Sequence, residues 1–206
     1  MKITILGAAG RTGTELVTQA LDAGHEVTAF VRTRADFTVT NAALTVVDGD
    51  AREEADVAKA LIGSDAVISA LGSMKSADQL ATRSAEALVV AARQAGVERV
   101  VSLSSFLASP NYKPNFVGKL MAGVLKSTVA DKSAGDAAVA ASGLDWTVVY
   151  ATSLDKAKPG SAVRTIGRDE TVSMRNGIAR ADVARFMLAE LTTSGHHRAA
   201  VLITSK

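Results

Sequence analysis

Three glycines near the amino terminus have the spacing of a dinucleotide-binding loop. Gly7, Gly10 and Gly13 follow a short apolar segment, residues 2–6, and lead into a helical pattern. In this context, backbone N–H groups and the positive end of the helix bind a phosphate. We expect Gly7 to allow a tight turn, Gly10 the close approach of a pyrophosphate, and Gly13 the close packing of helix on strand. The predicted loop contacts are Gly7, Ala9, Gly10, Arg11, Thr12 and Gly13.

The end of the predicted second strand bears on the choice of dinucleotide. NAD-specific sites place an Asp or Glu there, on the ribose hydroxyls of adenosine. Residues 30–34 read Phe-Val-Arg-Thr-Arg and contain no carboxylate. Arg32 offers the planar, bidentate hydrogen bonding that suits a 2′-phosphate, and Arg11 is expected to close on the same phosphate or on the adenine face. We therefore predict NADP(H) rather than NAD(H). A solvated strand end is the alternative for Arg32.

Short apolar segments alternate with helical patterns from residue 2 to about residue 150. This alternation is typical of βαβ units and a parallel sheet. Predicted strands cover residues 2–6, 26–32, 44–47, 66–69, 99–103, 146–150 and 200–204, and predicted helices include 79–95, 127–141 and 182–191. We predict an α/β fold: a Rossmann-type doubly wound, mainly parallel sheet flanked by helices, in a single domain of residues 1–206.

The regular alternation stops after residue 150. Residues 151–206 are therefore predicted to complete the substrate side, with short extended pieces at 163–166 and 171–173. The least regular segment, residues 109–117, is interpreted either as a substrate loop or as a plain surface connection.

The composition excludes several classes of function. The 206 residues carry 23 Lys+Arg and 21 Asp+Glu, a net charge of +2, so nucleic acid and membrane surfaces are not expected partners. The lack of cysteine excludes disulfides, Cys-ligated clusters and a cysteine nucleophile, and a cytoplasmic location is predicted. No segment approaches the roughly 18 apolar residues of a membrane span. His25, His196 and His197 lack the spacing of a metal site, so no metal is predicted, and a solvated loop is expected for the adjacent pair.

Several motifs, in this order along the chain, resemble a known family. They are GAAGRTG at 7–13, VR at 31–32, GD at 49–50, DAVISALG at 65–72, SGLDWT at 142–147 and IARADVA at 178–184. The chain resembles the atypical short-chain dehydrogenases of the NmrA-like and flavin reductase (biliverdin reductase B) type. The resemblance implies a Rossmann fold that holds NADP(H). It places Asp50 and Ala51 near the adenine and Ala70, Leu71 and Gly72 along the cofactor ribose.

Family members with alcohol dehydrogenase chemistry use a Ser after the fifth strand and a Tyr-x-x-x-Lys on the next helix, with both side chains on one helix face. Ser104 matches the serine, at the strand end where open α/β sheets place ligands; a purely structural serine is the alternative. Lys132 matches the lysine, to hold the nicotinamide ribose or an acidic acceptor, although a solvated lysine is equally compatible. The tyrosine position is then Thr128, whose hydroxyl is a poor proton donor, and Tyr112 lies in the irregular loop.

Thr152 and Ser153 occupy the place where relatives carry a Pro-Gly pair beside the nicotinamide, and they are predicted to contact the cofactor. Because the usual acid is missing, we expect an acceptor whose reduced anion is delocalised. The leading prediction is an NADP(H)-dependent oxidoreductase that reduces a small aromatic, flavin-like or quinone-like acceptor, as a monomer or small homo-oligomer. A non-catalytic NADP(H)-binding redox sensor resembling NmrA also fits the incomplete motif. A nucleotide-sugar epimerase or dehydratase is disfavoured, because such relatives depend on the tyrosine.

Overall fold

The central feature of the molecule is one large sheet between two layers of helices. The computed structural model describes residues 1–72, 79–112, 120, 123–167, 170, 172, 177–193 and 195–206. The strands are β1 (Lys2–Leu6), β2 (Glu26–Val31), β3 (Leu44–Asp48), β4 (Ala66–Ser69), β5 (Arg99–Ser105), β6 (Asp145–Ala151), β7 (Ser153–Leu154), β8 (Val163–Thr165), β9 (Gly177–Ile178) and β10 (Ala199–Ser205). The α-helices are α1 (Arg11–Asp22), α2 (Glu54–Leu61), α3 (Leu80–Ala95), α5 (Lys126–Ala140) and α6 (Arg180–Ala189), and the short 3-10 helices are η1 (Arg34–Asp36) and η3 (Phe106–Ala108).

The strand order is that of a doubly wound sheet. Eight strands lie in the order β3-β2-β1-β4-β5-β6-β10-β8, and β7 and β9 form a small separate pair. Every neighbouring pair in the large sheet is parallel except β10 and β8, which are antiparallel. The order reverses between β1 and β4, which is where such sheets open a crevice at the carboxyl ends of the strands. The predicted fold class is confirmed.

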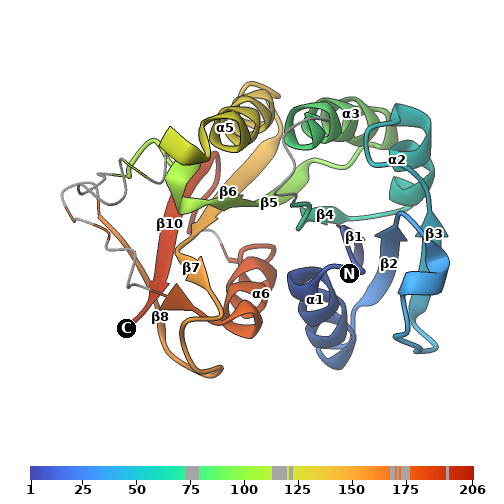
Figure 1. Cartoon of the computed structure of the whole chain (residues 1–206). Helices are drawn as coiled ribbons and strands as arrows, with labels where there is room; N and C mark the ends of the chain where they lie inside the picture. Colours follow the sequence, from blue (N-terminus) through green and yellow to red (C-terminus); the bar gives the residue numbers. More distant parts are fainter. Residues whose placement is uncertain are drawn as a thin grey trace.

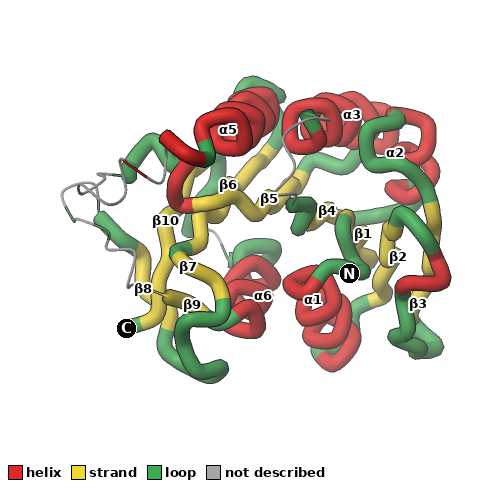
Figure 2. The backbone as a smooth tube through the Cα atoms, viewed as in Figure 1, coloured by secondary structure: helices red, strands yellow, loops and turns green. Residues whose placement is uncertain are grey.

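Helices cover both faces of the sheet. Helices α1 and α6 pack together on one face, and α2, α3 and α5 cover the other (Figure 1). Figure 2 shows these two helical layers in red on either side of the yellow strands. Each face has its own apolar cluster, and consecutive residues of one strand enter opposite clusters: Val67 and Ile68 of β4 do so, as do Val148 and Val149 of β6. Strands that are apolar on both sides are expected in a covered parallel sheet.

The carboxyl-terminal third departs from the simple alternation. The predicted strand at 200–204 is β10, which lies parallel to β6, and the predicted extended piece at 163–166 is β8 at the sheet edge. Residues 171 and 173 of the other piece, and residues 113–117 of the predicted substrate loop, lie outside the described residues. Within the described residues, no helix is both long and apolar enough to cross a membrane.

Candidate active site

Two adjoining hollows form a continuous cleft along the carboxyl ends of the strands. Their cavity volumes are about 350 and 430 Å³, within the size range of small-molecule sites. Gly10, Ala70, Leu71 and Gly72 line both hollows. The first hollow also holds the predicted residues Gly7, Ala9, Arg32, Asp50 and Ala51. The second also holds Arg11, Thr12, Ser104, Thr128, Lys132, Thr152 and Ser153. The structure thus gathers every predicted site residue except Gly13 around one cleft.

The glycine loop has the local geometry that its spacing predicts. Gly7 has φ +77°, a backbone conformation that residues with a side chain rarely adopt. Gly10 is the N-cap of α1, and among the described residues no side chain caps this helix and no acidic residue lies in its first turn. A Cβ at Gly13 would overlap the carbonyl oxygen of Gly7, so α1 can start this close to the loop only with glycine there. The arrangement leaves the positive end of α1 facing the cleft.

The two predicted arginines lie in different hollows. The exposed Arg32 lines the first hollow, whereas Arg11 lines the second. Arg11 is 73% exposed and its guanidinium forms an ion pair of 2.6 Å with Asp155, a residue at φ +64°. Asp155 also accepts a hydrogen bond of 2.9 Å from Nε of Arg180. In this structure Arg11 therefore joins the glycine loop to the turn after β7, and it does not converge with Arg32 on one point.

The predicted adenine-side residue Asp50 is held by its neighbour. Arg52 donates from Nε to both carboxylate oxygens of Asp50, at 2.9 and 3.1 Å. This hydrogen bonding lowers the pKa of Asp50 to about 2. The backbone N–H of Asp50 donates to Asp56 at 2.9 Å. Asp50 is thus a fixed negative charge at the wall of the first hollow.

A cluster of polar side chains surrounds Ser104. The Ser104 hydroxyl, 5% exposed, donates a hydrogen bond of 2.7 Å to Oδ2 of Asp136 on α5. Tyr150, 4% exposed, is the register partner of Ser104 on β6, and its hydroxyl also hydrogen-bonds Asp136. Lys132 lies one helical turn before Asp136. We call Ser104, Lys132, Asp136 and Tyr150 the Ser104 cluster.

Burial governs the charges of this cluster. Burial raises the pKa of Asp136, although hydrogen bonds from Ser104 and Tyr150 and the charge of Lys132 act in the opposite direction. Burial lowers the pKa of Lys132, against the attraction of Asp136 and Asp131. Tyr150 also has a raised pKa because of burial and the adjacent Asp136. A carboxyl group and an amine whose pKa values move toward each other are suited to proton exchange.

Contacts between α5 and α3 fix Lys132 and Asp136 in place. The Asp131 carboxylate accepts hydrogen bonds of 3.0 Å from the backbone N–H groups of Ala81 and Thr82, in the first turn of α3. One turn later, a Cβ at Gly135 would lie 2.5 Å from the Ala81 carbonyl oxygen. The two helices therefore approach closely where α5 carries the cluster.

The sequence did not single out Asp136 or Tyr150, although each had a signal. Asp136 stands four residues after Lys132, so both face the same side of α5. Tyr150 lies at the carboxyl end of β6, the edge where ligands bind. Thr128, at the expected tyrosine position, is half-buried and lines the second hollow. Tyr112 packs edge-on against Phe106, with ring centroids 5.1 Å apart.

The adjacent histidines are more ordered than the expected solvated loop. Nδ1 of His196 lies 2.8 Å from Oε1 of the buried Glu190, and Nδ1 of His197 lies 2.7 Å from the Asp145 carboxylate. The solvated-loop interpretation was incomplete: Glu190, at the carboxyl end of α6, is six positions before His196, whereas Asp145 of β6 is distant in the sequence from His197. In the part of the chain that the structure describes, no cluster of three His, Cys, Asp or Glu side chains could hold a metal ion.

Solved structures of other proteins share this fold. The oxidoreductase ylbE from Lactococcus lactis has a TM-score of 0.86 and 23% identity, over 100% of this chain and 91% of that chain. A short-chain dehydrogenase/reductase from Veillonella parvula, in complex with NADP, has a TM-score of 0.83 and 20% identity, over 98% and 93% of the two chains. The anaerobilin reductase ChuY from Escherichia coli O157:H7 has a TM-score of 0.80 and 20% identity, over 100% and 97%.

Sequence comparison identifies the family. The isoflavone reductase homolog IRL from Zea mays is 37% identical over 87 residues, which are 38% of this chain and only 28% of that protein. The family model described as NAD(P)H-binding matches residues 7–194. The resemblance to atypical short-chain dehydrogenases is confirmed by these matches. The chain belongs to the NAD(P)H-binding family.

Proposed function

We propose that this protein is an NADP(H)-dependent reductase that transfers a hydride to a small aromatic, flavin-like or quinone-like acceptor. The observation that carries the proposal is the continuous cleft, which runs from Arg32, past the glycine loop, to Ser104 and Lys132. Its two hollows would divide a dinucleotide between an adenosine half and a nicotinamide half. When bound, the dinucleotide supplies the hydride.

The residues of the cleft fit such a cofactor. The uncapped start of α1 and the absence of a side chain at Gly10 favour a pyrophosphate at the glycine loop. Arg32 would bind the 2′-phosphate, with Asp50 and Ala51 beside the adenine. Ala70, Leu71 and Gly72, which line both hollows, would follow the ribose. Thr152 and Ser153 would contact the nicotinamide.

The second hollow is suited to a planar acceptor. Besides the polar residues, its walls include Leu103, Phe106, Leu107, Val129 and Leu154. Apolar walls with a few placed polar groups are typical of sites for aromatic ligands. Residues 151–154 and Arg180 line this hollow, which supports the prediction that residues 151–206 complete the substrate side. One structural relative is by its name an anaerobilin reductase, which is compatible with reduction of a small molecule in this cleft.

Ser104 and Lys132 are the proposed acceptor-side residues. The Ser104 hydroxyl would hydrogen-bond the reducible group of the acceptor. The half-buried Lys132 would hold the nicotinamide ribose or an acidic substituent of the acceptor. Thr128 lines the same wall but its hydroxyl is a poor acid, so an acceptor with a delocalised reduced anion remains favoured.

Oxidation of NADPH in the presence of acceptors tests the proposal. Loss of NADPH absorbance would be followed with FMN, riboflavin, a linear tetrapyrrole, quinones and simple ketones, with NADH in parallel. We expect enzyme-dependent loss with NADPH and a conjugated acceptor, and a clear fall after Ser104→Ala. Tight NADPH binding without turnover would instead support the redox-sensor function, and faster loss with NADH would contradict the role of Arg32.

A further inference from the structure

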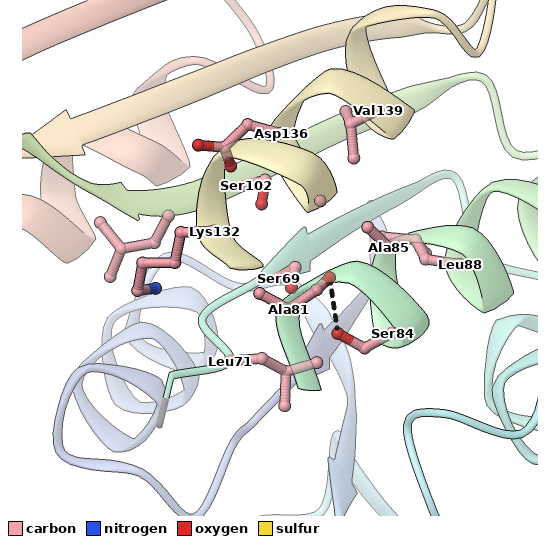
Figure 3. Close-up of a pocket in the computed structure, with 12 residues that line it drawn as sticks. Ser69, Leu71, Ala81, Ser84, Ala85, Leu88, Ser102, Lys132, Asp136 and Val139 are labelled. Carbon is pink, nitrogen blue, oxygen red and sulfur yellow. Dashed lines mark hydrogen bonds between the residues drawn. The ribbon is translucent and has the colours of Figure 1, made fainter. Parts of the chain in front are cut away.

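A third, much smaller cavity borders the Ser104 cluster. It lies between α3, α5 and the strands β4 and β5, and has a volume of about 30 Å³, enough for one water molecule. Ser69, Ser102, Lys132 and Asp136 contribute polar side chains to its wall (Figure 3). Leu71, Leu103 and Lys132 line both this cavity and the second hollow of the cleft, so they lie between the two, and Lys132 is the polar one of the three.

The Ser104–Asp136 contact can conduct a proton in either direction. A serine hydroxyl both donates and accepts, and its hydrogen rotates freely. Ser104 donates to Asp136 at 2.7 Å when the carboxylate is ionised. When Asp136 is protonated, the same contact runs in reverse, and the Ser104 hydrogen is released toward the cleft. The carboxyl group itself need not reach the acceptor.

We propose that Asp136 is a positioning and proton-relay residue, which supplies through the Ser104 hydroxyl the proton that the reduced acceptor would otherwise take from water. The inference rests on the proposed reductase function. As the hydride arrives, the acceptor takes the Ser104 hydroxyl proton, and the Ser104 oxygen takes the carboxyl proton of Asp136. One O–H bond breaks at each group, one forms on the acceptor and one re-forms at Ser104. The acceptor is reduced by two electrons, and Asp136 is left as a carboxylate.

Lys132 can restore the proton to Asp136. Its ammonium group would pass a proton to Asp136 by way of a water molecule in the internal cavity, and it would then recover one from solvent through the cleft. This route uses the position of Lys132 between the two cavities. It also gives the Lys132–Asp136 pair a role that a solvated helix lysine would not have.

Tyr150 tunes the relay but is not its proton source. It is almost completely buried, and its hydroxyl donates toward Asp136 rather than into the cleft. That hydrogen bond stabilises the ionised carboxylate and so lowers the pKa of Asp136 against the effect of burial. Removal of the Tyr150 hydroxyl should make Asp136 retain its proton to higher pH.

The pH dependence follows from the groups that face Asp136. Among the described residues, the titratable ones are Lys132 on its own helix and Tyr150 on β6. The other polar groups at the internal cavity are serines: Ser69 of β4, Ser84 of α3 and Ser102 of β5. The relay needs Asp136 protonated, so kcat should fall as the pH rises through the pKa of this carboxyl group.

Three variants, two of Asp136 and one of Tyr150, distinguish a relay from a structural role. Asp136→Asn keeps the size and an acceptor oxygen but holds no transferable proton. We expect kcat for a quinone to fall on the order of 100-fold, with KM for NADPH within twofold and without the alkaline fall of kcat. Asp136→Glu should recover part of kcat together with that fall. Tyr150→Phe should move the alkaline fall of kcat to higher pH. Ser133→Ala, on the exposed face of α5, is the matched control.

The following outcomes would contradict the proposed relay. If Asp136→Asn lowers kcat but keeps the alkaline fall, or leaves both unchanged, the relay is wrong while the reductase stands. If Asp136→Asn does not fold, an unmoved pH profile in Tyr150→Phe overturns the relay by itself. If the wild-type protein does not oxidise NADPH with any of the acceptors tested, the reductase function is refuted, and the relay is refuted with it.

Discussion

Arg11 and Asp155 form an ion pair of 2.6 Å that joins the glycine loop to the turn after β7. The Asp155 carboxylate therefore lies beside the start of α1, where we propose that the cofactor pyrophosphate binds. A carboxylate at this position repels an incoming phosphate and occupies an arginine that could otherwise contact it.

Asp155→Asn should strengthen NADPH binding. Asn tolerates the positive φ of this position, so the substitution removes the charge with little change in backbone strain. We expect Kd for NADPH to fall roughly three- to tenfold at low ionic strength, with a smaller effect at high salt. Fluorescence titration at two salt concentrations measures this. Glu26→Gln, whose carboxylate pairs with Lys2, is the control for charge. Weaker binding after Asp155→Asn would mean that the ion pair is needed to shape the loop.

Arg32→Ala should weaken binding of NADPH more than binding of NADH. Loss of charge-assisted hydrogen bonds to a 2′-phosphate corresponds to about 1.5–3 kcal/mol, or roughly a 10- to 100-fold rise in Kd. The Kd for NADH, which lacks this phosphate, should change little. Arg34→Ala is a matched control, because Arg34 is close in the chain and donates to the Val46 carbonyl oxygen. An equal loss for both dinucleotides would refute the assignment of Arg32 to the 2′-phosphate.

Gly13→Ala should disturb both stability and cofactor binding. The added Cβ would overlap the Gly7 carbonyl oxygen, so α1 has to move away from the loop. Overpacking of this kind destabilises proteins by about 1–3 kcal/mol, and the shifted helix start should raise Kd for NADPH at least tenfold. Urea denaturation and NADPH titration measure the two effects. Gly167→Ala is the control, since within the described residues nothing lies within 4 Å of its added Cβ.

Arg52→Ala should destabilise the protein in a pH-dependent way. The folded-state pKa of Asp50 is lowered from 3.8 to about 2, mainly by hydrogen bonds from Arg52. A lowered pKa contributes stability above the unfolded-state value, and this contribution is lost as the pH falls through the folded-state value. The side chains are partly exposed, so we expect a difference of less than about 1 kcal/mol at pH 7. Urea denaturation should show that difference shrinking between about pH 4 and pH 2. A difference that is constant with pH would exclude the Asp50 pair as its cause.

The sequence predicted the geometry of the glycine loop better than the contacts around Ser104. Gly7 and Gly13 act locally, through backbone conformation and contact within one loop, so their spacing was enough to predict their geometry. Ser104 hydrogen-bonds Asp136 only because α5 packs against β5. Tyr150 lies beside Ser104 because of the register between β5 and β6. Arg11 turns to Asp155, a partner 144 positions further along the chain. Such contacts depend on tertiary packing, which short-range patterns do not encode.

The position of β10 also affects how the cleft is made. β10 lies between β6 and β8, and Ala199–Ile203 pair with Thr147–Ala151, the strand that leads to Thr152 and Ser153. During synthesis, β6 emerges some fifty residues before its partner, and until then one side of it is an unpaired edge that invites aggregation. A nascent chain that ends before Ala199 would thus present an open edge beside the wall of the second hollow.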